Sequence, residues 1–498
     1  MTQIKKLAGQ TAYYGISSIL ARVLNFLLLP IWTDRLAREE YGAATEVYGY
    51  LALLLILYTF GMETAFFRFS KKSTSQKVYH SSASAVLLVA LVLSSLIALN
   101  ADGLAAYLGN NVQPRYVTYL AAILFIDAAI AIPFAKLRLG EKALRFALIK
   151  TTVVSITIIL NLLLLVIFPD ILNGKYLTSL QPAVARIYES SDLIGYIFFA
   201  NLAANMCYIP LLWPEISRLR LRIDWITFKP MLIYAFPLFI MGLAGMFNEQ
   251  GYAILFEYVF PGNDELSATG ALGVFSSTVK LSVIMMLGIQ AFRYAAEPFF
   301  FNHADNKQAP ALFARIMHYF VVFNVVILVA VTLNTPLISA IFIQSENYKE
   351  ALYVLPVLLL AKLFYGIYVN LSVWFKLKDK TIFGSYFASA GALITLAGNL
   401  LLIPILGFLG SALTTLACYL TMCFLCYRSG RKHFPIPYKF SPLLIHLLIA
   451  ASLILLTWQF DIENNLINYG SGLLITLVYA GVVFWFEWRK LNYKTEEV

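Results

Sequence analysis

Charged and reactive side chains are scarce in this 498-residue sequence. Only 13% of the residues are Asp, Glu, Lys or Arg, 60% are hydrophobic, and the chain has four Cys and five His. A soluble protein carries about 25% charged residues, so this chain has too few to cover a soluble surface. Four cysteines exclude a secreted disulfide scaffold, and an aromatic content of 15% excludes a disordered chain. The remaining class is an all-α polytopic membrane protein, whose surroundings are mostly lipid.

The sequence patterns of common enzymes and pumps are also missing. No P-loop is present, which excludes an ATP-driven pump, and the five histidines lack metal-ligand spacing. The C-x-x-C pattern of Cys423 and Cys426 lies inside an apolar run, where packing explains it. We therefore expect no enzyme, no catalytic residue, no metal and no cofactor, while coupling to H+ or Na+ stays open.

Long apolar runs dominate the sequence instead. A membrane-spanning helix needs roughly 20 predominantly apolar residues. Fourteen runs meet this condition, and they predict about 14 transmembrane helices: 8–32, 41–67, 80–100, 116–135, 146–168, 193–213, 231–260, 268–292, 312–341, 351–374, 382–403, 408–426, 443–460 and 469–486.

The basic residues show which loops face the cytoplasm. With the N-terminus inside, the cytoplasmic segments hold 27 Lys and Arg, and the opposite loops hold 6. This asymmetry follows the positive-inside rule and predicts that both termini are cytoplasmic. It also accounts for the net charge of +10 without nucleic acid, which we exclude as a partner. We expect a multi-pass protein of the cell inner membrane.

The order of the spans predicts a repeat. The predicted cytoplasmic loop at 214–230 follows six spans and precedes six more, so the two sets would be related by an axis along the membrane normal. The expected parts are an N-lobe at 1–214, a linker at 215–230, a C-lobe at 231–428 and a C-terminal helix pair at 441–488. Asp127 and Lys362 support the repeat, because each lies at the middle of an equivalent span.

Ionisable residues inside the spans are the candidate site. A charge at mid-bilayer costs at least about 2.5–3.5 kcal/mol, so it faces a water-filled cavity or a partner. A cavity rich in cations would suit an anionic or polyhydroxylated cargo. The alternative is buried structural pairs, such as Asp127 with Arg22. The deep residues are Arg22, Asp127, Glu249, Lys280 and Lys362, and Glu63 lies nearer a span end.

Several motifs, in their order along the chain, carry a family resemblance. They are Gly15 to Pro30 with Arg22 and Asn25, Gly61 to Phe69, Pro133 to Arg138, Phe275 to Leu281, Gln290 to Phe300, and Asn399 to Pro404. With these motifs the chain resembles the polysaccharide-unit flippases, the lipid-linked oligosaccharide transporters of the multidrug/oligosaccharidyl-lipid/polysaccharide exporter superfamily. The resemblance covers nearly the whole sequence.

The resemblance implies two six-helix lobes around a central cavity, plus two C-terminal helices. Spans one, two, seven and eight would line the cavity, and Arg22, Glu249 and Lys280 lie on three of them. The cargo would be an undecaprenyl-diphosphate-linked oligosaccharide, moved from the cytoplasmic to the periplasmic leaflet without ATP hydrolysis. Cationic side chains would bind its diphosphate by charge-assisted hydrogen bonds. Membrane lipid and polysaccharide polymerase machinery are the further expected partners.

Three other functions stay open. A peptidoglycan-precursor flippase would share the fold and would also carry a prenyl diphosphate. A multidrug or cation antiporter of the same superfamily is disfavoured, because three deep cations would repel its cargo. A membrane glycosyltransferase, polymerase or ligase is disfavoured by the short periplasmic loops, which leave little room for a catalytic site.

Overall fold

A computed structural model describes residues 15, 19–20, 22–70, 75–109, 112–303, 308–378, 380–457 and 464–495 of the chain. These residues form helices and contain no strand, which confirms the predicted all-α class. Within this part, twelve helices are long and apolar enough to cross a membrane. The number is thirteen if α15 (Ala268–Leu281) and α16 (Val283–Asn302), which are bent by 42°, form one span. These thirteen match predicted spans two to fourteen in order, and the first predicted span, 8–32, is described only at residues 15, 19–20 and 22–32.

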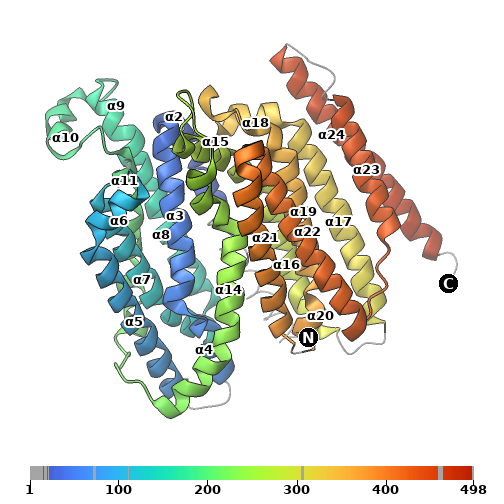
Figure 1. Ribbon diagram of the computed structural model, residues 1–498, viewed down its shortest axis with the longest axis horizontal. Helices are drawn as coiled ribbons and strands as arrows, with labels where there is room; N and C mark the ends of the chain where they lie inside the picture. Colours follow the sequence, from blue (N-terminus) through green and yellow to red (C-terminus); the bar gives the residue numbers. More distant parts are fainter. Residues whose placement is uncertain are drawn as a thin grey trace.

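Residues 22–216 form a first group of helices, which we call the N-lobe (Figure 1, blue to green). Its long helices run side by side, and short helices lie at their ends. Its elements are α2 (Leu29–Arg35), α3 (Arg38–Thr59), α4 (Met62–Ser70), α5 (Ser75–Leu99), α6 (Ala101–Leu108), α7 (Pro114–Leu139), α8 (Ala143–Leu162), η1 (Leu163–Ile167), α9 (Phe168–Leu172), η2 (Thr178–Leu180), α10 (Gln181–Ile187), α11 (Leu193–Met206), α12 (Tyr208–Leu211) and α13 (Trp213–Ile216).

Residues 225–433 form a second group, which we call the C-lobe. Its first helix already begins inside the predicted 215–230 linker and runs through Pro230 and Pro237 without a break. The elements are α14 (Trp225–Val259), α15, α16, α17 (Ala309–Leu333), α18 (Thr335–Phe342), η3 (Glu346–Tyr348), η4 (Leu352–Val354), α19 (Leu355–Leu371), α20 (Val373–Leu377), α21 (Ile382–Leu406) and α22 (Phe408–His433).

Two further helices, α23 (Phe440–Thr457) and α24 (Asn465–Thr495), lie along the outside of the C-lobe against α17 (Figure 1, red). A buried carboxylate joins the three helices. Glu487 on α24 lies 2.8 Å from His318 Nε2 on α17 and 3.4 Å from His446 Nε2 on α23. The pair is therefore attached to the C-lobe by polar contacts as well as by apolar packing.

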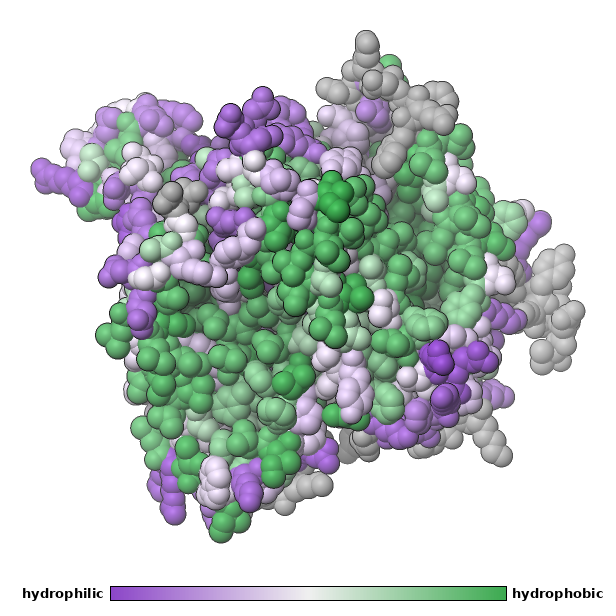
Figure 2. All heavy atoms as spheres, in the orientation of Figure 1, coloured by the Kyte–Doolittle hydropathy of each residue, from purple (hydrophilic) through white to green (hydrophobic). Residues whose placement is uncertain are grey.

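The surface agrees with a membrane-embedded protein. Hydrophobic residues cover the middle of the face shown in Figure 2, and hydrophilic residues gather toward its ends. Exposed leucines, such as Leu88, Leu91 and Leu96 on α5, show the same pattern. In lipid these side chains need no polar cover, which explains why so much apolar surface is left open.

The molecule has two opposite ends, the α10 side and the linker side. The α10 side bears α9, α10 and the connection from α14 to α15, and the linker side bears residues 217–224 and α20 (Figure 1). On the linker side the chain turns between α3 and α4 at Phe60 and Gly61, both with positive φ. Gly61 also lies against the backbone of α14, where a side chain would meet the Ala235 carbonyl oxygen at 2.9 Å.

The lobes meet at the α10 side through backbone contact between α3 and α15. A methyl group at Gly42 would overlap the carbonyl oxygen of Thr269, and one at Gly273 would overlap the carbonyl oxygen of Arg38. Small residues that let two helix backbones approach this closely are typical of membrane helix pairs. Glycine at these two positions is therefore what allows the α10 side to close.

Polar contacts hold the same side together. The Tyr348 hydroxyl donates to the carbonyl oxygens of Leu36 and Ala37, at 3.0 and 2.9 Å. The Arg38 guanidinium forms an ion pair with Glu350 at 3.0 Å and donates to the Glu265 carbonyl oxygen at 2.9 Å. Each of these contacts joins the N-lobe to the C-lobe, so all of them must break if the lobes separate here.

Candidate functional site

A cavity of about 500 Å³ lies between the two lobes. Its walls come from α2 and the segment that leads into it, from α3, α8, α11 and α12 of the N-lobe, and from α14, α15, α16 and α19 of the C-lobe. This volume is within the usual range for ligand sites, about 300–1,000 Å³. Four Arg, Lys or Glu side chains line it: Arg22, Glu249, Lys280 and Lys362. Three cations face one acid, so the wall carries an excess of positive charge.

Lys280 stands at the contact between the lobes. It lies in the last turn of α15, just before the bend at Ser282, whose hydroxyl donates to the Val279 carbonyl oxygen at 2.6 Å. Its Nζ is 3.8 Å from the centre of the Trp32 ring and 5.0 Å from that of Tyr41, both in the N-lobe. A cation over aromatic faces is stabilised without being neutralised. The charge therefore stays available to an anionic ligand in the cavity.

The aromatic partner of Lys280 is itself held in place. Trp32 Nε1 donates to Asn161 Oδ1 on α8 at 3.3 Å, and Asn161 Nδ2 donates to the Thr157 carbonyl oxygen at 2.8 Å. Trp32, Asn161 and Thr157 all line the cavity. This chain of contacts fixes the indole under the Lys280 ammonium.

Lys362 and Glu249 form the C-lobe side of the wall. Lys362 on α19 is 7% exposed, with its Nζ 6.0 Å from the centre of the Tyr419 ring. Glu249 lies on α14, and both side chains line the cavity without forming an ion pair within the described part of the chain. An acid and a base that share a cavity but stay apart leave room for water or a ligand between them.

Arg22 lines the cavity from the N-lobe, and the structure does not pair it with Asp127. Asp127 Oδ1 accepts a hydrogen bond from Asn205 Nδ2 at 2.9 Å, and it is Asn205 that lines the cavity. Among the described residues the Arg22 guanidinium has no hydrogen bond or ion pair. The alternative of a buried Arg22–Asp127 pair is therefore not what the structure contains, and Asp127 lies one layer behind the wall.

Glu63 lies away from the cavity. It is on α4 at the linker side, where it forms an ion pair with Arg138 on α7. Arg138 also stacks over the Phe67 ring, 4.9 Å from its centre. This geometry joins two helices of the N-lobe, and it does not bring Glu63 to the residues around Lys280.

The cavity also contains many uncharged polar residues that the sequence analysis did not select. Amides and hydroxyls both donate and accept hydrogen bonds, so they suit a hydroxylated ligand. The signal in the sequence is the group of amides inside apolar spans. These residues are Asn25, Thr45, Tyr48, Thr157, Asn161, Asn201, Asn205, Tyr208, Gln250, Tyr252, Ser276 and Ser282.

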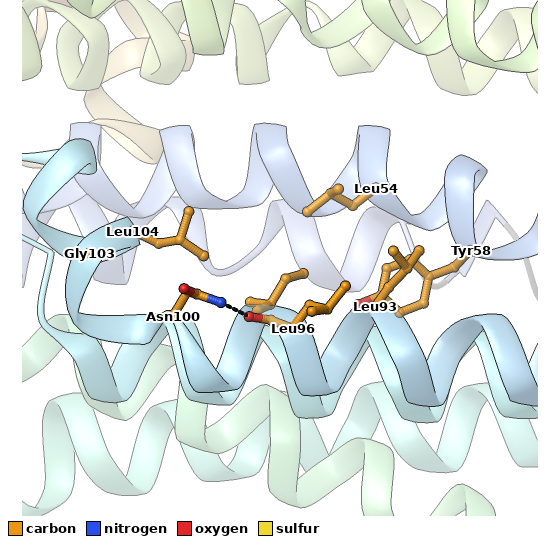
Figure 3. Close-up of a pocket in the computed structure, with 8 residues that line it drawn as sticks. Leu54, Tyr58, Leu93, Leu96, Asn100, Gly103 and Leu104 are labelled. Atoms are coloured by element: carbon orange, nitrogen blue, oxygen red, sulfur yellow. Dashed lines mark hydrogen bonds between the residues drawn. The ribbon is translucent and has the colours of Figure 1, made fainter.

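A second hollow lies on the N-lobe and differs in character. Figure 3 shows Leu54 and Tyr58 of α3 facing Leu93, Leu96 and the start of α6. Its polar group, the Asn100 amide, donates to the Leu96 carbonyl oxygen at 2.8 Å. This apolar hollow has no charged side chain on its wall, so it offers nothing to bind an anion.

Comparisons with known proteins identify solved structures that share the fold. No protein-family profile and no curated protein sequence matches the chain. Among solved structures, lipid II flippase MurJ in an inward closed conformation superposes with a TM-score of 0.71 and 15% identity, covering 96% of this chain and 99% of that one. The chain has the fold of MurJ. An inward-facing multidrug resistance MATE transporter of the MOP superfamily gives a TM-score of 0.65 and 13% identity, over 82% of this chain and 94% of that one.

These likenesses confirm the expected fold, which this chain shares with MurJ and the MATE transporters. A further MATE structure, in the straight conformation, gives a TM-score of 0.59 at 15% identity and covers 86% of this chain. MurJ is covered over nearly its whole length, whereas the two MATE matches leave more of this chain unmatched. At these identities the comparison concerns the fold, and the ligand must be argued from the cavity.

Proposed function

We propose that the protein is a flippase for an undecaprenyl-diphosphate-linked oligosaccharide, which it moves from the cytoplasmic to the periplasmic leaflet. Transport proceeds by alternating access without ATP hydrolysis and supplies polysaccharide biosynthesis. The distribution of Lys and Arg orients the α10 side toward the periplasm and both termini toward the cytoplasm. The protein acts as a transporter of the inner membrane and carries out no bond chemistry on its cargo.

The single observation that carries this proposal is the charge of the cavity. Arg22 of the N-lobe and Lys280 of the C-lobe line the same space, with Lys362 in the same wall. A diphosphate is matched by more than one cation, and charge-assisted hydrogen bonds to it are about twice as strong as neutral ones. The amides and hydroxyls around these cations supply donors and acceptors for sugar hydroxyls.

The position of the cations on opposite lobes gives the mechanism. A cargo that contacts both lobes favours states in which they stay close around it, and a ligand shifts a conformational equilibrium only through such differential contacts. With the α10 side closed by α3 and α15, we assign loading of the cargo to the linker side. Release then requires the α3–α15 contact to break while the linker side closes.

A peptidoglycan-precursor flippase is the second candidate. Its support is the superposition on MurJ, which covers 99% of that chain. Both cargoes carry a prenyl diphosphate, so the three cations fit either one. A cation antiporter is less well supported, because its cargo would meet three positive side chains and one carboxylate.

The experiment compares Arg22→Ala and Lys280→Ala with wild type in cells that depend on this flippase, scoring membrane abundance and glycan export. We expect normal abundance and loss of export in both variants, because each removes a charge from the cavity without breaking an ion pair between described residues. Arg186→Ala on α10 and Lys142→Ala before α8 are the matched controls, since both side chains are exposed outside the cavity.

A further variant at Arg22 separates the contribution of hydrogen-bond geometry from that of the positive charge alone. Arg22→Lys keeps the charge but loses the planar fork that binds phosphate through two parallel hydrogen bonds. Reduced export would show that bidentate contact matters. Wild-type export from both alanine variants at normal abundance would contradict the proposed role of the cavity. Transport of a peptidoglycan precursor, without transport of the oligosaccharide, would favour the second candidate.

A further inference from the structure

Two carboxyl groups meet between the lobes at the α10 side, apart from the cavity just described. Glu46 lies on α3 and is 1% exposed, and Glu257 lies on α14 two residues before its end. Contacts between α3 and α14 bring the two carboxyl groups together: the Tyr50 and Tyr258 hydroxyls lie 3.3 Å apart, and Gly49 packs against Ala253. Glu257 Oε1 accepts from the Thr269 hydroxyl on α15 at 2.8 Å. The contact therefore joins three helices from both lobes.

Among the described residues, no group donates a hydrogen bond to the carboxyl group of Glu46. Neither of its oxygens, nor Oε2 of Glu257, has a hydrogen-bond partner among the described residues. An unpaired carboxylate in a buried place is costly, and two of them side by side repel each other. The ligand that removes both penalties is a proton, which turns one carboxylate into a donor for the other.

The packing of α3 explains why water is kept out. Gly42, Glu46 and Gly49 are spaced i, i+4 and i+7, so they share one face of the helix. A methyl group at Gly49 would lie 3.0 Å from the Ala253 side chain on α14, and one at Gly42 would overlap the backbone of α15. Glycine above and below Glu46 lets the lobes close tightly around its carboxyl group.

The other polar side chains that face the pair are tyrosines. Tyr50 on α3 and Tyr258 on α14 have their hydroxyl oxygens 3.3 Å apart, and the Tyr107 ring of α6 lies 6.1 Å from that of Tyr258. Phenol hydroxyls ionise near pH 10. Within the described part of the chain no cation forms an ion pair with either carboxyl group. A proton is thus the charge that balances the pair.

We propose that Glu46 and Glu257 form a proton-binding site between the lobes, occupied when the α10 side is closed and emptied when it opens. The proposal rests on the proposed function, for which it names the proton as the coupling ion. In the closed state one carboxyl O–H donates to the other carboxylate. When the lobes separate, water hydrates both groups, the O–H bond breaks, and the proton passes to water on the α10 side. The two carboxylates then oppose reclosure until a proton returns.

The site makes a quantitative prediction. If the closed state binds one proton more than the open state, the open-to-closed ratio rises about tenfold for each pH unit within the titration range. A glutamine at either position cannot ionise and keeps a donor amide, so it holds the α10 side closed at every pH. The effect therefore requires both carboxyl groups.

The experiment measures the separation of the lobes directly. Spin labels are placed at Ser190 of the N-lobe and Asp264 of the C-lobe, both exposed at the α10 side, in the full chain with Cys207→Ser. The protein is held in lipid nanodiscs without cargo, and distances are recorded from pH 5 to pH 8. We expect the long-distance population to grow with pH in the wild type and to stay small in Glu46→Gln and in Glu257→Gln.

The controls exclude other causes. Glu265→Gln removes an exposed carboxyl group near the same contact and is expected to keep the wild-type response. A response that persists in both glutamine variants, or that is absent from the wild type, overturns the proposal. So does a distance change driven by Na+ at constant pH. Because no cargo is present, these outcomes are independent of a flipping assay, which tests the proposed function separately.

Discussion

Gly42→Ala tests whether the close contact of α3 with α15 closes the α10 side. The added methyl group would overlap the carbonyl group of Thr269, and it would lie 3.2 Å from the Gly273 nitrogen. These obstacles are backbone atoms, so no side-chain rotation relieves them. The lobes must move apart for the alanine to fit.

The expected change in the open-to-closed ratio follows from the cost of overpacking in the closed state. Overpacking of a close contact costs about 1–3 kcal/mol. Alanine is favoured over glycine in a helix by about 0.8–1.0 kcal/mol, but α3 is helical in both the closed and the open state, so this gain cancels. Every 1.4 kcal/mol is a factor of ten, and the open-to-closed ratio should therefore rise about 5- to 150-fold.

The assay is the distance between labels at Ser190 and Asp264. Gly245→Ala is the matched control, because it makes the same substitution on α14 at a position with nothing within 4 Å of the added carbon. We expect a larger long-distance population in Gly42→Ala than in Gly245→Ala at the same pH. Identical distance distributions in the two variants would refute the assignment of this contact as the closure.

Two further variants test neighbouring contacts. Tyr348→Phe removes the hydroxyl proton that the Leu36 and Ala37 carbonyl oxygens share, worth roughly 0.5–1.5 kcal/mol, and should enlarge the same long-distance population. Trp32→Leu and Lys280→Met, combined in a double-mutant cycle, should give a coupling free energy of unfolding of about 0.5–2 kcal/mol. A coupling near zero would show that the indole does not hold the ammonium.

Much of the fold was predictable because membrane helices show themselves in long apolar runs. The runs at 382–403 and 408–426 correspond to α21 and α22, which begin at Ile382 and Phe408. The bend between α15 and α16 was not predicted. The Ser282 hydroxyl bonds to the Val279 carbonyl oxygen at the bend, and such bonds often bend helices. Thr157 makes a similar bond inside the unbroken helix α8, so the residue type alone does not show where a bend occurs.

The candidate site was predictable only in part. Arg22 and Lys280 are costly in lipid wherever they point, so their need for a cavity or a partner is visible in the sequence. The surroundings of Asp127 depend on Asn205, which is distant in sequence, and single residues do not show that pairing. Glu46 was missed for the same reason, because its burial comes from Gly42, Gly49 and a helix 200 residues later.

The most direct test of the account is a flipping assay with purified protein in vesicles. The initial rate at which a prenyl-diphosphate-linked oligosaccharide crosses the bilayer is measured for three proteins. They are the wild type, the cavity double variant Arg22→Ala/Lys280→Ala, and the exposed-charge double variant Lys142→Ala/Arg186→Ala. We predict flipping well above empty vesicles for the wild type and the exposed-charge control, and the rate of empty vesicles for the cavity double variant. Equal rates for the two double variants, or no flipping by the wild type, would contradict the claim that this cavity carries a diphosphate-linked glycan.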